Sequence, residues 1–379
     1  MSGSADSAHA GAEAMPQALA EALRRIGPSL AQVESTMREQ LGAAHGAGLG
    51  SESLGVLRHI GEHVLEAGGK RLRPALLMLA AELCGYAGPR RVQIAAAVEL
   101  LHTATLLHDD VVDLSDTRRG RAAARAIWGN RRAVLVGDFF YARASAMVVE
   151  DGDPDVLWIF ADTIARMAEG ELLQLEKSFE PGVSEAHYHA VIERKSASLT
   201  AAAAEAGAIL GGVTRAERRR VAEFGREFGL AFQLRDDALD YGADAQALGK
   251  PPHADLREGK VTLPLILTLK RCSAAERDAV AALLKTAARR AAQLDAAQLG
   301  DAATGVEPSG AAAERSAVLE ESEIAPVLEL VQRHRGALDT DRRAQEHVAR
   351  AAAAIAPFPD GPARRALLAA ADYAAARTH

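Results

Sequence analysis

Long stretches with a helical repeat of apolar positions alternate along the chain with short breaks rich in glycine and proline. No run of β-branched residues alternates with polar ones over a strand's length, and Ala, Leu, Arg and Glu dominate throughout. Breaks such as Gly88-Pro89 and Pro251-Pro252 mark the ends of the stretches. The pattern predicts helices over 16–44, 51–67, 72–87, 91–113, 131–149, 155–178, 185–211, 215–242 and 261–271, and several more towards the end.

The fold class predicted from this pattern is all-α. Segment 91–113 is apolar over much of its circumference, which is typical of a helix buried among other helices in one large bundle. The opening residues are rich in Ser, Gly and acidic side chains, so residues 1–20 are expected to form a disordered tail and 21–379 the domain. Small and polar residues at 300–316 predict a flexible connection between helices.

Charge and composition narrow the class of function. The 44 Lys and Arg against 51 Asp and Glu give a net charge of −7, so no nucleic-acid partner is expected. No apolar run approaches the roughly 18 residues of a membrane helix, so no transmembrane segment is predicted. Cys84 and Cys272 lie far apart without CxxC spacing, which fits a cytoplasmic protein.

Two acidic motifs carry the candidate chemistry. DDVVD supplies Asp109 and Asp113, which lie four residues apart and therefore on one helix face, about 40° from each other. Like charges so placed repel unless a cation neutralises them, and Mg²⁺ characteristically joins one or two carboxylates to substrate phosphates. DDALD repeats the arrangement with Asp236, Asp237 and Asp240. Two such motifs in apolar helices could hold one polyanion between them through metal ions.

A basic cluster precedes the first motif, and two arginines follow it. GGKRLRP places Lys70, Arg71 and Arg73 at the start of a helix, where side chains and backbone N–H groups can grip an anion. Arg118 and Arg119 offer the bidentate donors that phosphate oxygens accept. These cations predict a diphosphate site beside the carboxylates.

The chain resembles the trans-polyprenyl diphosphate synthases, in particular the octaprenyl type. GGKRLRP, LLHDDVVD followed by RRG, GDFFYARA, ERKSASL, FQLRDDALD and GKPPHADLREGKVTLPLI occur in that family's order, over roughly 55–270 and again in 364–377. The resemblance implies an all-α bundle of the isoprenoid synthase type around a central cavity, and a homodimer. It also implies an enzyme that joins isopentenyl diphosphate to an allylic diphosphate, such as farnesyl or geranylgeranyl diphosphate, with three Mg²⁺ ions per site.

The resemblance also implies a role for individual positions. Asp109, Asp113 and Asp236 match metal ligands, with Asp237 and Asp240 nearby. The allylic side is matched by Arg118, Lys195, Ser196, Gln233, Lys250 and Lys260, of which Lys195, Gln233 and Lys250 are expected to assist catalysis with the three ligands. The isopentenyl diphosphate pocket is matched by Lys70, Arg73, His102 and Arg119.

Product length is expected to depend on the helix that precedes Asp109. Thr105 and Ala104 lie about 6 and 7.5 Å back along the helix axis, where bulky aromatics floor the pocket of short-chain members. Because both residues are small here, a long product of the octaprenyl to decaprenyl type is predicted, which would partition into membranes.

Two departures from the family pattern stand out. Ala122, Ala123, Ala124 and Arg125 follow RRG where Pro, Thr and Asn are usual, and Ser196 stands where Thr is common.

The alternatives to a long-chain synthase are a geranylgeranyl synthase, a class I terpene cyclase, a silent subunit of a heteromeric synthase and a plain helical binding module. A cyclase needs no second diphosphate pocket, and a silent subunit would be expected to lose acidic residues.

Overall fold

The computed structural model describes residues 15–42, 51–69, 71–242, 253–304 and 319–377. Helices make up most of this part of the chain, as the sequence predicts. The elements in order are α1 (Gln17–Gly42), α2 (Ser51–Glu66), α3 (Leu72–Leu83), α4 (Arg90–Val112), β1 (Thr117–Arg118), β2 (Arg121–Ala122), α5 (Ala124–Trp128), α6 (Asn130–Asp151), α7 (Pro154–Glu176), α8 (Glu185–Ile192), the π-helical segment η2 (Glu193–Ala197), α9 (Ser198–Leu210), α10 (Arg215–Asp240), α11 (Ala254–Arg257), α12 (Leu263–Leu269), α13 (Ala274–Thr304), α14 (Glu321–Arg333), α15 (Gly336–Ile355) and α16 (Pro362–Ala376).

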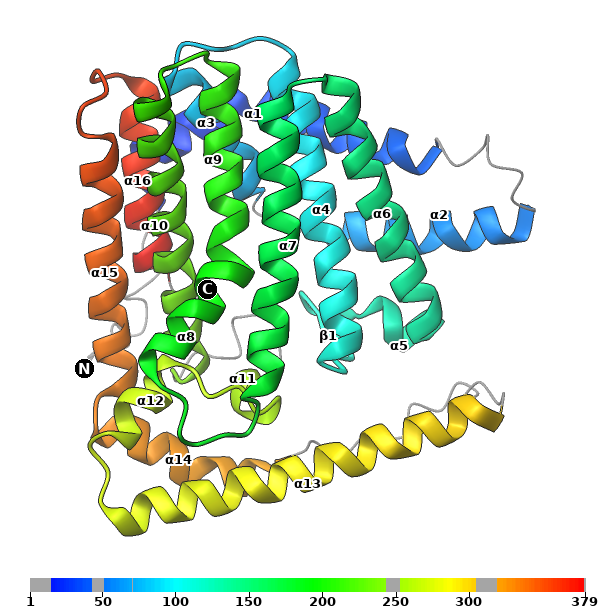
Figure 1. Ribbon diagram of the computed structural model, residues 1–379, viewed down its shortest axis with the longest axis vertical. Helices are drawn as coiled ribbons and strands as arrows, with labels where there is room; N and C mark the ends of the chain where they lie inside the picture. Colours follow the sequence, from blue (N-terminus) through cyan, green and yellow to red (C-terminus); the bar gives the residue numbers. More distant parts are fainter. Residues whose placement is uncertain (1–14, 43–50, 70, 243–252, 305–318, 378–379) are drawn as a thin grey trace, which may run out of the picture.

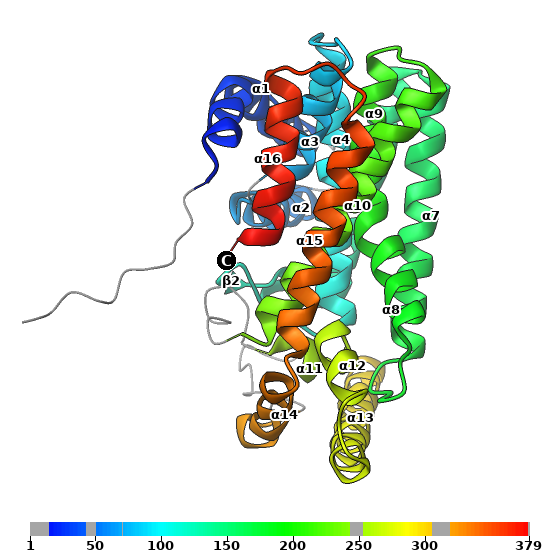
Figure 2. The same cartoon turned by 90° about the vertical axis from the view of Figure 1, so that its left-hand side faces the viewer.

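Helices α4, α7, α10 and α15 run side by side along the long axis of the molecule (Figure 1). Helix α10 packs against α9 and α15, and α4 packs against α6 and α3. Helices α13 and α14 lie crosswise at the lower end in both views (Figures 1 and 2). The result is one bundle whose helices share a single hydrophobic core.

Local sequence explains where the site-bearing helices begin. At the start of α10, the Thr214 hydroxyl accepts from the Glu217 N–H at 3.3 Å, and the Glu217 carboxylate accepts from the Thr214 N–H at 2.9 Å. This reciprocal pair forms a capping box. The Asp153 carboxylate caps α7 through the Asp155 N–H at 3.0 Å, next to Pro154 in the first turn. Helix α4 is buried around much of its circumference, as predicted for 91–113.

Two predicted boundaries differ from the structure. Helix α1 begins at Gln17, so the last four positions of the expected tail are helical, while residues 1–14 lie outside the described part. Helix α13 continues to Thr304 and takes up the first positions of the predicted 300–316 connection, whose remainder from 305 is outside the described residues. Both segments are rich in alanine, which favours continuation of a helix.

A short hairpin interrupts the helices and was not predicted. Strands β1 and β2 pair Thr117 with Ala122 and Arg118 with Arg121. Arg119 and Gly120 form the turn with φ of 52° and 73°, the left-handed values that a tight two-residue hairpin turn requires. Strands of two residues are too short to leave an alternating pattern in the sequence.

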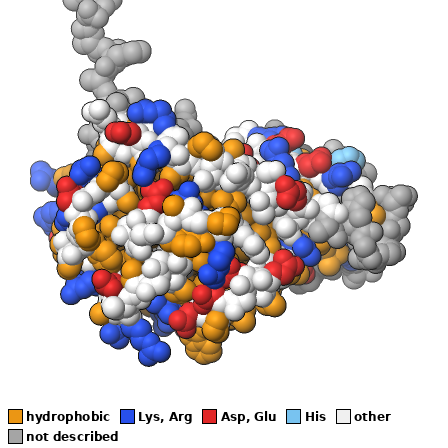
Figure 3. Space-filling model, turned by 90° about the horizontal axis from the view of Figure 1, so that it is seen from above, with side chains coloured by type: hydrophobic (Ala, Val, Ile, Leu, Met, Phe, Trp, Pro, Cys, Tyr) orange, Lys and Arg blue, Asp and Glu red, His pale blue; other side chains and the backbone are white. Residues whose placement is uncertain are grey.

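The surface carries mixed charges. Seen from above, acidic and basic side chains are interspersed with apolar ones (Figure 3). None of the helices in the described ranges is long and apolar enough to cross a membrane.

Candidate active site

A cavity of about 1040 Å³ opens between α4, α7, η2 and α10. Carboxylates, cations and apolar side chains all line it. Of the residues singled out from the sequence, the lining includes Arg73, His102, Thr105, Asp109, Asp113, Arg118, Arg119, Lys195, Ser196, Gln233, Asp236, Asp237, Asp240 and Lys260. The two aspartate motifs therefore share one chamber. Lys70 and Lys250 lie outside the described residues.

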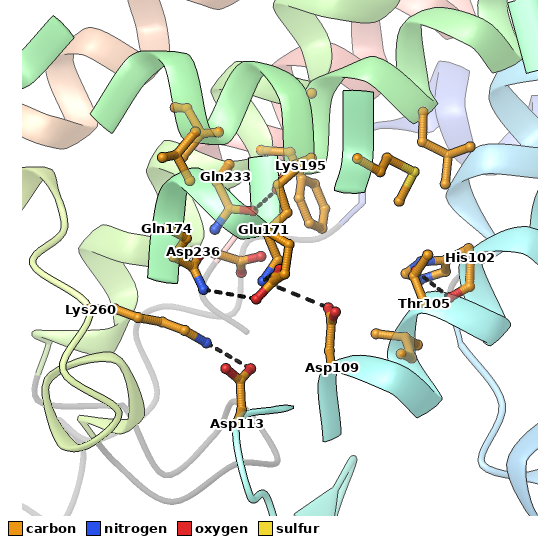
Figure 4. A pocket seen from close by; sticks show the side chains of 18 of the residues that line it. His102, Thr105, Asp109, Asp113, Glu171, Gln174, Lys195, Gln233, Asp236 and Lys260 are labelled. Atoms are coloured by element: carbon orange, nitrogen blue, oxygen red, sulfur yellow. Dashed lines mark hydrogen bonds and ion pairs between the residues drawn. The ribbon is translucent and has the colours of Figure 1, made fainter. Parts of the chain in front are cut away.

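The first motif presents Asp109 and Asp113 from the end of α4. Asp109 points towards Glu171 and Lys195, and Asp113 points towards Lys260 (Figure 4). Lys260 donates to Asp113 at 2.8 Å and to Glu258 at 2.6 Å. Burial alone would lower the pKa of Lys260, but the charges of Glu258 and Asp113 outweigh it and raise that pKa well above its usual value. Lys260 is therefore a permanent cation that holds Asp113 in place.

All three carboxylates of the second motif line the cavity, but Asp236 is the most exposed of them, and the other two are buried and hold the structure around it. Asp236 lines the cavity and pairs with Arg377 from the end of the chain. Asp240 accepts the backbone N–H groups of Ala254 and Asp255, each at 3.1 Å, and so fixes the start of α11. Its two oxygens are thereby engaged with the backbone.

Asp237 is the most enclosed member of the second motif, with 2% of its surface exposed. It accepts the Tyr188 hydroxyl at 2.5 Å and the Gln233 amide at 2.8 Å, and Gln233 in turn accepts the Ser196 hydroxyl at 2.7 Å. Burial, reinforced by Asp255, raises the pKa of Asp237 well above its usual range. This chain of contacts fixes Gln233 and Ser196 at the cavity wall.

A π-helical segment brings Lys195 into the site. Single π turns of this kind often occur at functional sites, because they shift side chains out of the α-helical register. In η2 the shift places Lys195 against Glu171 of α7 and 3.9 Å from Asp109. Burial raises the pKa of Glu171, while the neighbouring Lys195 opposes that rise.

Basic side chains collect at the other end of the chamber. Strand β1 of the hairpin carries Arg118, whose Nε donates to Asp110 at 2.7 Å. Arg119, in the hairpin turn, has no hydrogen bond to the described residues. Arg119 packs over Gly69, where an added Cβ would lie 2.8 Å from its Nη1. The Nε of Arg73 is buried and has no partner within the described ranges. Buried cations without hydrogen-bond partners are suited to receive an anion.

Glu99 is the buried counter-charge of this basic end, with 3% of its surface exposed. Its Oε1 accepts Nη1 of Arg71 at 2.9 Å, and Arg71 also donates to Glu34 at 3.0 Å. The charge of Glu99 also acts on Arg73 and Arg119, where it opposes the lowering of their pKa by burial. Glu99 therefore stabilises a group of arginines that would otherwise repel one another.

His102 lies on the same face of α4 as Asp109, two turns back, and lines the chamber (Figure 4). Burial, together with Arg73 and the other nearby arginines, lowers the pKa of His102 well below its usual value. His102 is therefore a neutral hydrogen-bonding group at neutral pH.

The two small residues expected to control product length occupy different surroundings. Thr105 lines the cavity, whereas Ala104 is 1% exposed within the core and is not part of the lining. Neighbouring helix positions point about 100° apart, and of these two only Thr105 faces the chamber. Leu101, one turn before Thr105, is a lining residue.

The atypical segment after the first motif has a structural role. Arg125, 5% exposed, donates from Nη1 to the Leu114 carbonyl at 2.7 Å and to Asp116 at 2.6 Å, and from Nε to Asn130 at 3.1 Å. It ties the hairpin that carries Arg118 and Arg119 to α6.

Sequence reasoning missed several residues that surround the chamber: Glu99, Glu171, Gln174, Tyr188 and Arg377. Glu99 and Glu171 are acidic residues within apolar helical stretches, a signal that could have been noticed. The placing of Tyr188 and Arg377 depends on contacts across distant segments, which the sequence did not indicate.

Comparisons with known proteins agree with this geometry. The sequence model described as "Polyprenyl synthetase" matches residues 55–299. The chain belongs to the polyprenyl synthetase family. This match confirms the predicted family, and the helices of the structure confirm the predicted all-α fold.

Individual members of the family are similar over most of the chain. Octaprenyl diphosphate synthase of Escherichia coli is 40% identical over 322 residues, covering 85% of this chain and 90% of that protein. Nonaprenyl diphosphate synthase of Mycobacterium tuberculosis is 33% identical over 83% of this chain and 85% of its own length. A polyprenyl synthase crystal structure from Caulobacter crescentus, in complex with calcium and isoprenyl diphosphate, superposes with a TM-score of 0.79. That structure is 37% identical and covers 95% of this chain and 98% of its own.

Proposed function

We propose that this polyprenyl synthetase condenses isopentenyl diphosphate with an allylic diphosphate, farnesyl or geranylgeranyl diphosphate, and releases a long all-trans polyprenyl diphosphate. One observation carries the proposal: two aspartate motifs and a basic cluster line the same chamber. A metal-bound diphosphate would bind between the motifs, and a second diphosphate would bind among the cations. A terpene cyclase needs no such second pocket.

The donor set suits Mg²⁺. Asp109, Asp113 and Asp236 offer hard carboxylate oxygens at the cavity wall, where Lys260 and Arg377 pair with the last two. Asp237 and Asp240 are buried, and their oxygens accept hydrogen bonds from Tyr188, Gln233 and the backbone of α11. We assign the first three as ligands and the other two as residues that hold the motif in place, with three ions per site as the proposed number. When bound, Mg²⁺ supplies charge stabilisation to the departing diphosphate.

The chain's own groups perform the remaining tasks. Lys195 and Lys260 stand beside the carboxylates, where their charge favours the leaving diphosphate, and Lys250 is proposed to join them. Gln233 and Ser196 orient the allylic substrate through their fixed amide and hydroxyl. Arg118 serves the same side through its pairing with Asp110.

The basic end is proposed to hold isopentenyl diphosphate. Arg73 and Arg119 would neutralise its charge, with His102 as a neutral donor and Lys70 as a further cation. The double bond of isopentenyl diphosphate then forms the new carbon–carbon bond as the allylic carbon–oxygen bond breaks with its electron pair on diphosphate. A proton lost to that diphosphate completes the step.

The reaction requires a dry chamber, because water would capture an allylic cation. Apolar side chains from α7, α8, α9 and α10 line its inner wall: Ile164, Met167, Val191, Ile192, Leu199 and Phe232. This wall also gives the growing hydrocarbon chain a surface to bind. A long product is supported by the small Thr105 and by the octaprenyl and nonaprenyl names of the relatives.

We also propose a homodimer in the cytoplasm. Large apolar side chains are exposed on the neighbouring helices α6 and α7, including Leu135 at 66%, Trp158 at 72% and Leu172 at 68%. Burial of such a surface against a second copy would remove it from water. Both cysteines are free thiols, in keeping with a reducing compartment.

Pyrophosphate release tests the reaction class. Purified protein with isopentenyl and farnesyl diphosphates should release pyrophosphate only when Mg²⁺ is present, and Asp236→Asn should lower the rate at least a hundredfold. Asp360→Asn, on an exposed aspartate in the segment between α15 and α16, is the control and should match the unmodified enzyme. Release without divalent metal, or equal rates in both variants, would contradict the proposal.

A further inference from the structure

Cys272, Glu276 and His334 meet at the lower end of the bundle, and none of them belongs to the lining of the active-site cavity. Cys272 lies in the turn between α12 and α13, and Glu276 lies in the first turn of α13. His334 ends α14, just before α15 begins. We call the crosswise helices α13 and α14 together the arm (Figure 1). The three residues lie where the arm meets the rest of the bundle, at the start of α13 and the end of α14, and we call this junction the root of the arm.

The three side chains present ligand atoms to one another. The cysteine sulfur, a glutamate oxygen and a histidine ring nitrogen all lie within 4.8 Å of each other. His334 Nε2 is 4.0 Å from Oε2 of Glu276, too far for a hydrogen bond. To bind a metal ion with bonds of roughly 2.0 to 2.3 Å, these ligand atoms would have to move only about 1 Å closer to one another.

Burial provides an independent sign of a ligand. Cys272 is 4% exposed, and Nε2 of His334 is buried without a hydrogen-bond partner in the described part of the chain. An unpaired buried nitrogen costs about 1 to 3 kcal/mol. A bound cation would remove that cost.

Glu276 is already held in position. Its Oε2 accepts the Ser273 N–H at 2.8 Å and the Ser273 hydroxyl at 3.0 Å, and its Oε1 accepts Arg333 at 2.8 Å. These contacts cap α13 and do not by themselves require a metal. Carboxylates that bind metals are commonly oriented by such outer hydrogen bonds, so the cap and a metal bond are compatible.

We propose that Cys272, Glu276 and His334 form a binding site for a thiophilic divalent cation of the Zn²⁺ class, with water as the fourth ligand. Sulfur, imidazole and carboxylate together are typical zinc ligands, and Mg²⁺ would not select a thiolate. The ion would clamp the root of the arm to α12 and α15. Its role would be structural and separate from the prenyl chemistry.

Metal binding at this site should release a proton. A cysteine thiol in ordinary surroundings carries its proton at neutral pH. Only the thiolate binds a metal. The measured enthalpy of binding should therefore change with the ionisation enthalpy of the buffer.

Co²⁺ is the direct probe, because its thiolate complexes give a charge-transfer band in the near ultraviolet and tetrahedral d–d bands in the visible. The full-length protein, stripped of metal and held in excess Mg²⁺, should develop these bands with one equivalent of Co²⁺, and Zn²⁺ should abolish them. Since the chain has two cysteines, Cys84→Ser is the matched control and should retain the spectrum. Cys272→Ser should lose the charge-transfer band, and His334→Ala should bind Co²⁺ at least tenfold more weakly.

Circular dichroism of the metal-free variants establishes that they fold. If Cys272→Ser does not fold, His334→Ala at the partly exposed helix end carries the test. Absence of a thiolate band in the wild-type protein would overturn the proposal. Persistence of the band in Cys272→Ser, or unchanged Co²⁺ affinity in His334→Ala, would overturn it as well.

Discussion

Glu99 sets the charge balance at the basic end of the chamber. A diphosphate can replace the negative charge that Glu99 supplies, so the residue matters most when the site is empty. Glu99→Gln should lower the unfolding free energy of the substrate-free protein by about 3 kcal/mol, because it breaks a buried ion pair. Added pyrophosphate should recover more stability in this variant than in the wild type, as measured by thermal unfolding.

Glu34 gives the matched control, since it also pairs with Arg71 but is 44% exposed at its side chain. Glu34→Gln should change stability by less than about 1 kcal/mol. Equal effects of the two substitutions would show that Glu99 has no special part in balancing the arginines.

Thr105 is the position from which product length can be tested. Thr105→Phe places a large ring in the chamber and should shorten the products, which chromatography of the dephosphorylated alcohols would measure. Thr105→Ser should leave the distribution unchanged. Phe at Ala104 is a poorer test than the sequence suggested, because that side chain is buried in the core. An unaltered distribution in Thr105→Phe would place the stop elsewhere.

At the scale of single residues, the sequence was informative where chemistry and spacing coincide. The aspartates, Lys195, Gln233 and Lys260 all line one chamber, as their motifs suggested. The sequence could not distinguish Asp236, which is partly exposed in the cavity, from Asp237, which is buried and accepts the Tyr188 hydroxyl from another helix. That difference depends on a contact 49 positions away in the chain.

Among the elements, η2 depends on the close approach of α7. Gly170 makes this approach possible, since a Cβ there would lie 2.7 Å from the backbone nitrogen of Lys195. Gly170→Ala should push η2 away and separate Lys195 from Glu171. We expect a fall in kcat of at least tenfold and a loss of about 1 to 3 kcal/mol in stability.

Gly182→Ala is the corresponding control, because nothing lies within 4 Å of a Cβ at that position. Steady-state kinetics and thermal unfolding of the two variants give the comparison. Normal kcat in Gly170→Ala would mean that η2 tolerates the displacement and that its position is not critical.

The helical periodicity and the Gly and Pro breaks predicted most of the helices, but they did not predict two short elements that are not α-helical. The hairpin at 117–122 and the π turn at 193–197 are each only a few residues long, and both aim cations at the chamber. Arg119 adopts a left-handed backbone that a non-glycine residue rarely takes, so this turn could not be predicted from its residues.

At the scale of the whole molecule, the exposed apolar face of α6 and α7 predicts that two copies of the chain associate through it as a dimer. Trp158→Asp should convert a dimer into a monomer, which light scattering after size-exclusion chromatography would measure. Leu338→Asp alters another exposed apolar residue, 61% exposed on α15, and should leave the dimer intact. A monomeric wild-type protein, or a dimer that survives Trp158→Asp, would contradict this interface.

The overall architecture was predictable because the helical pattern and the order of the motifs pointed to the same fold. Apolar helical stretches indicated a bundle, and the motif order indicated its family. The arm and its root were not predictable, since Cys272 and His334 are 62 positions apart and carry no motif spacing.

The most direct test of the central claim is to size the products of the reaction. The protein is incubated with labelled isopentenyl diphosphate, Mg²⁺ and farnesyl or geranylgeranyl diphosphate, and the products are separated by chain length. The structure predicts Mg²⁺-dependent incorporation of several isoprene units into octaprenyl to decaprenyl diphosphate. Failure to consume isopentenyl diphosphate with either starter would contradict the account.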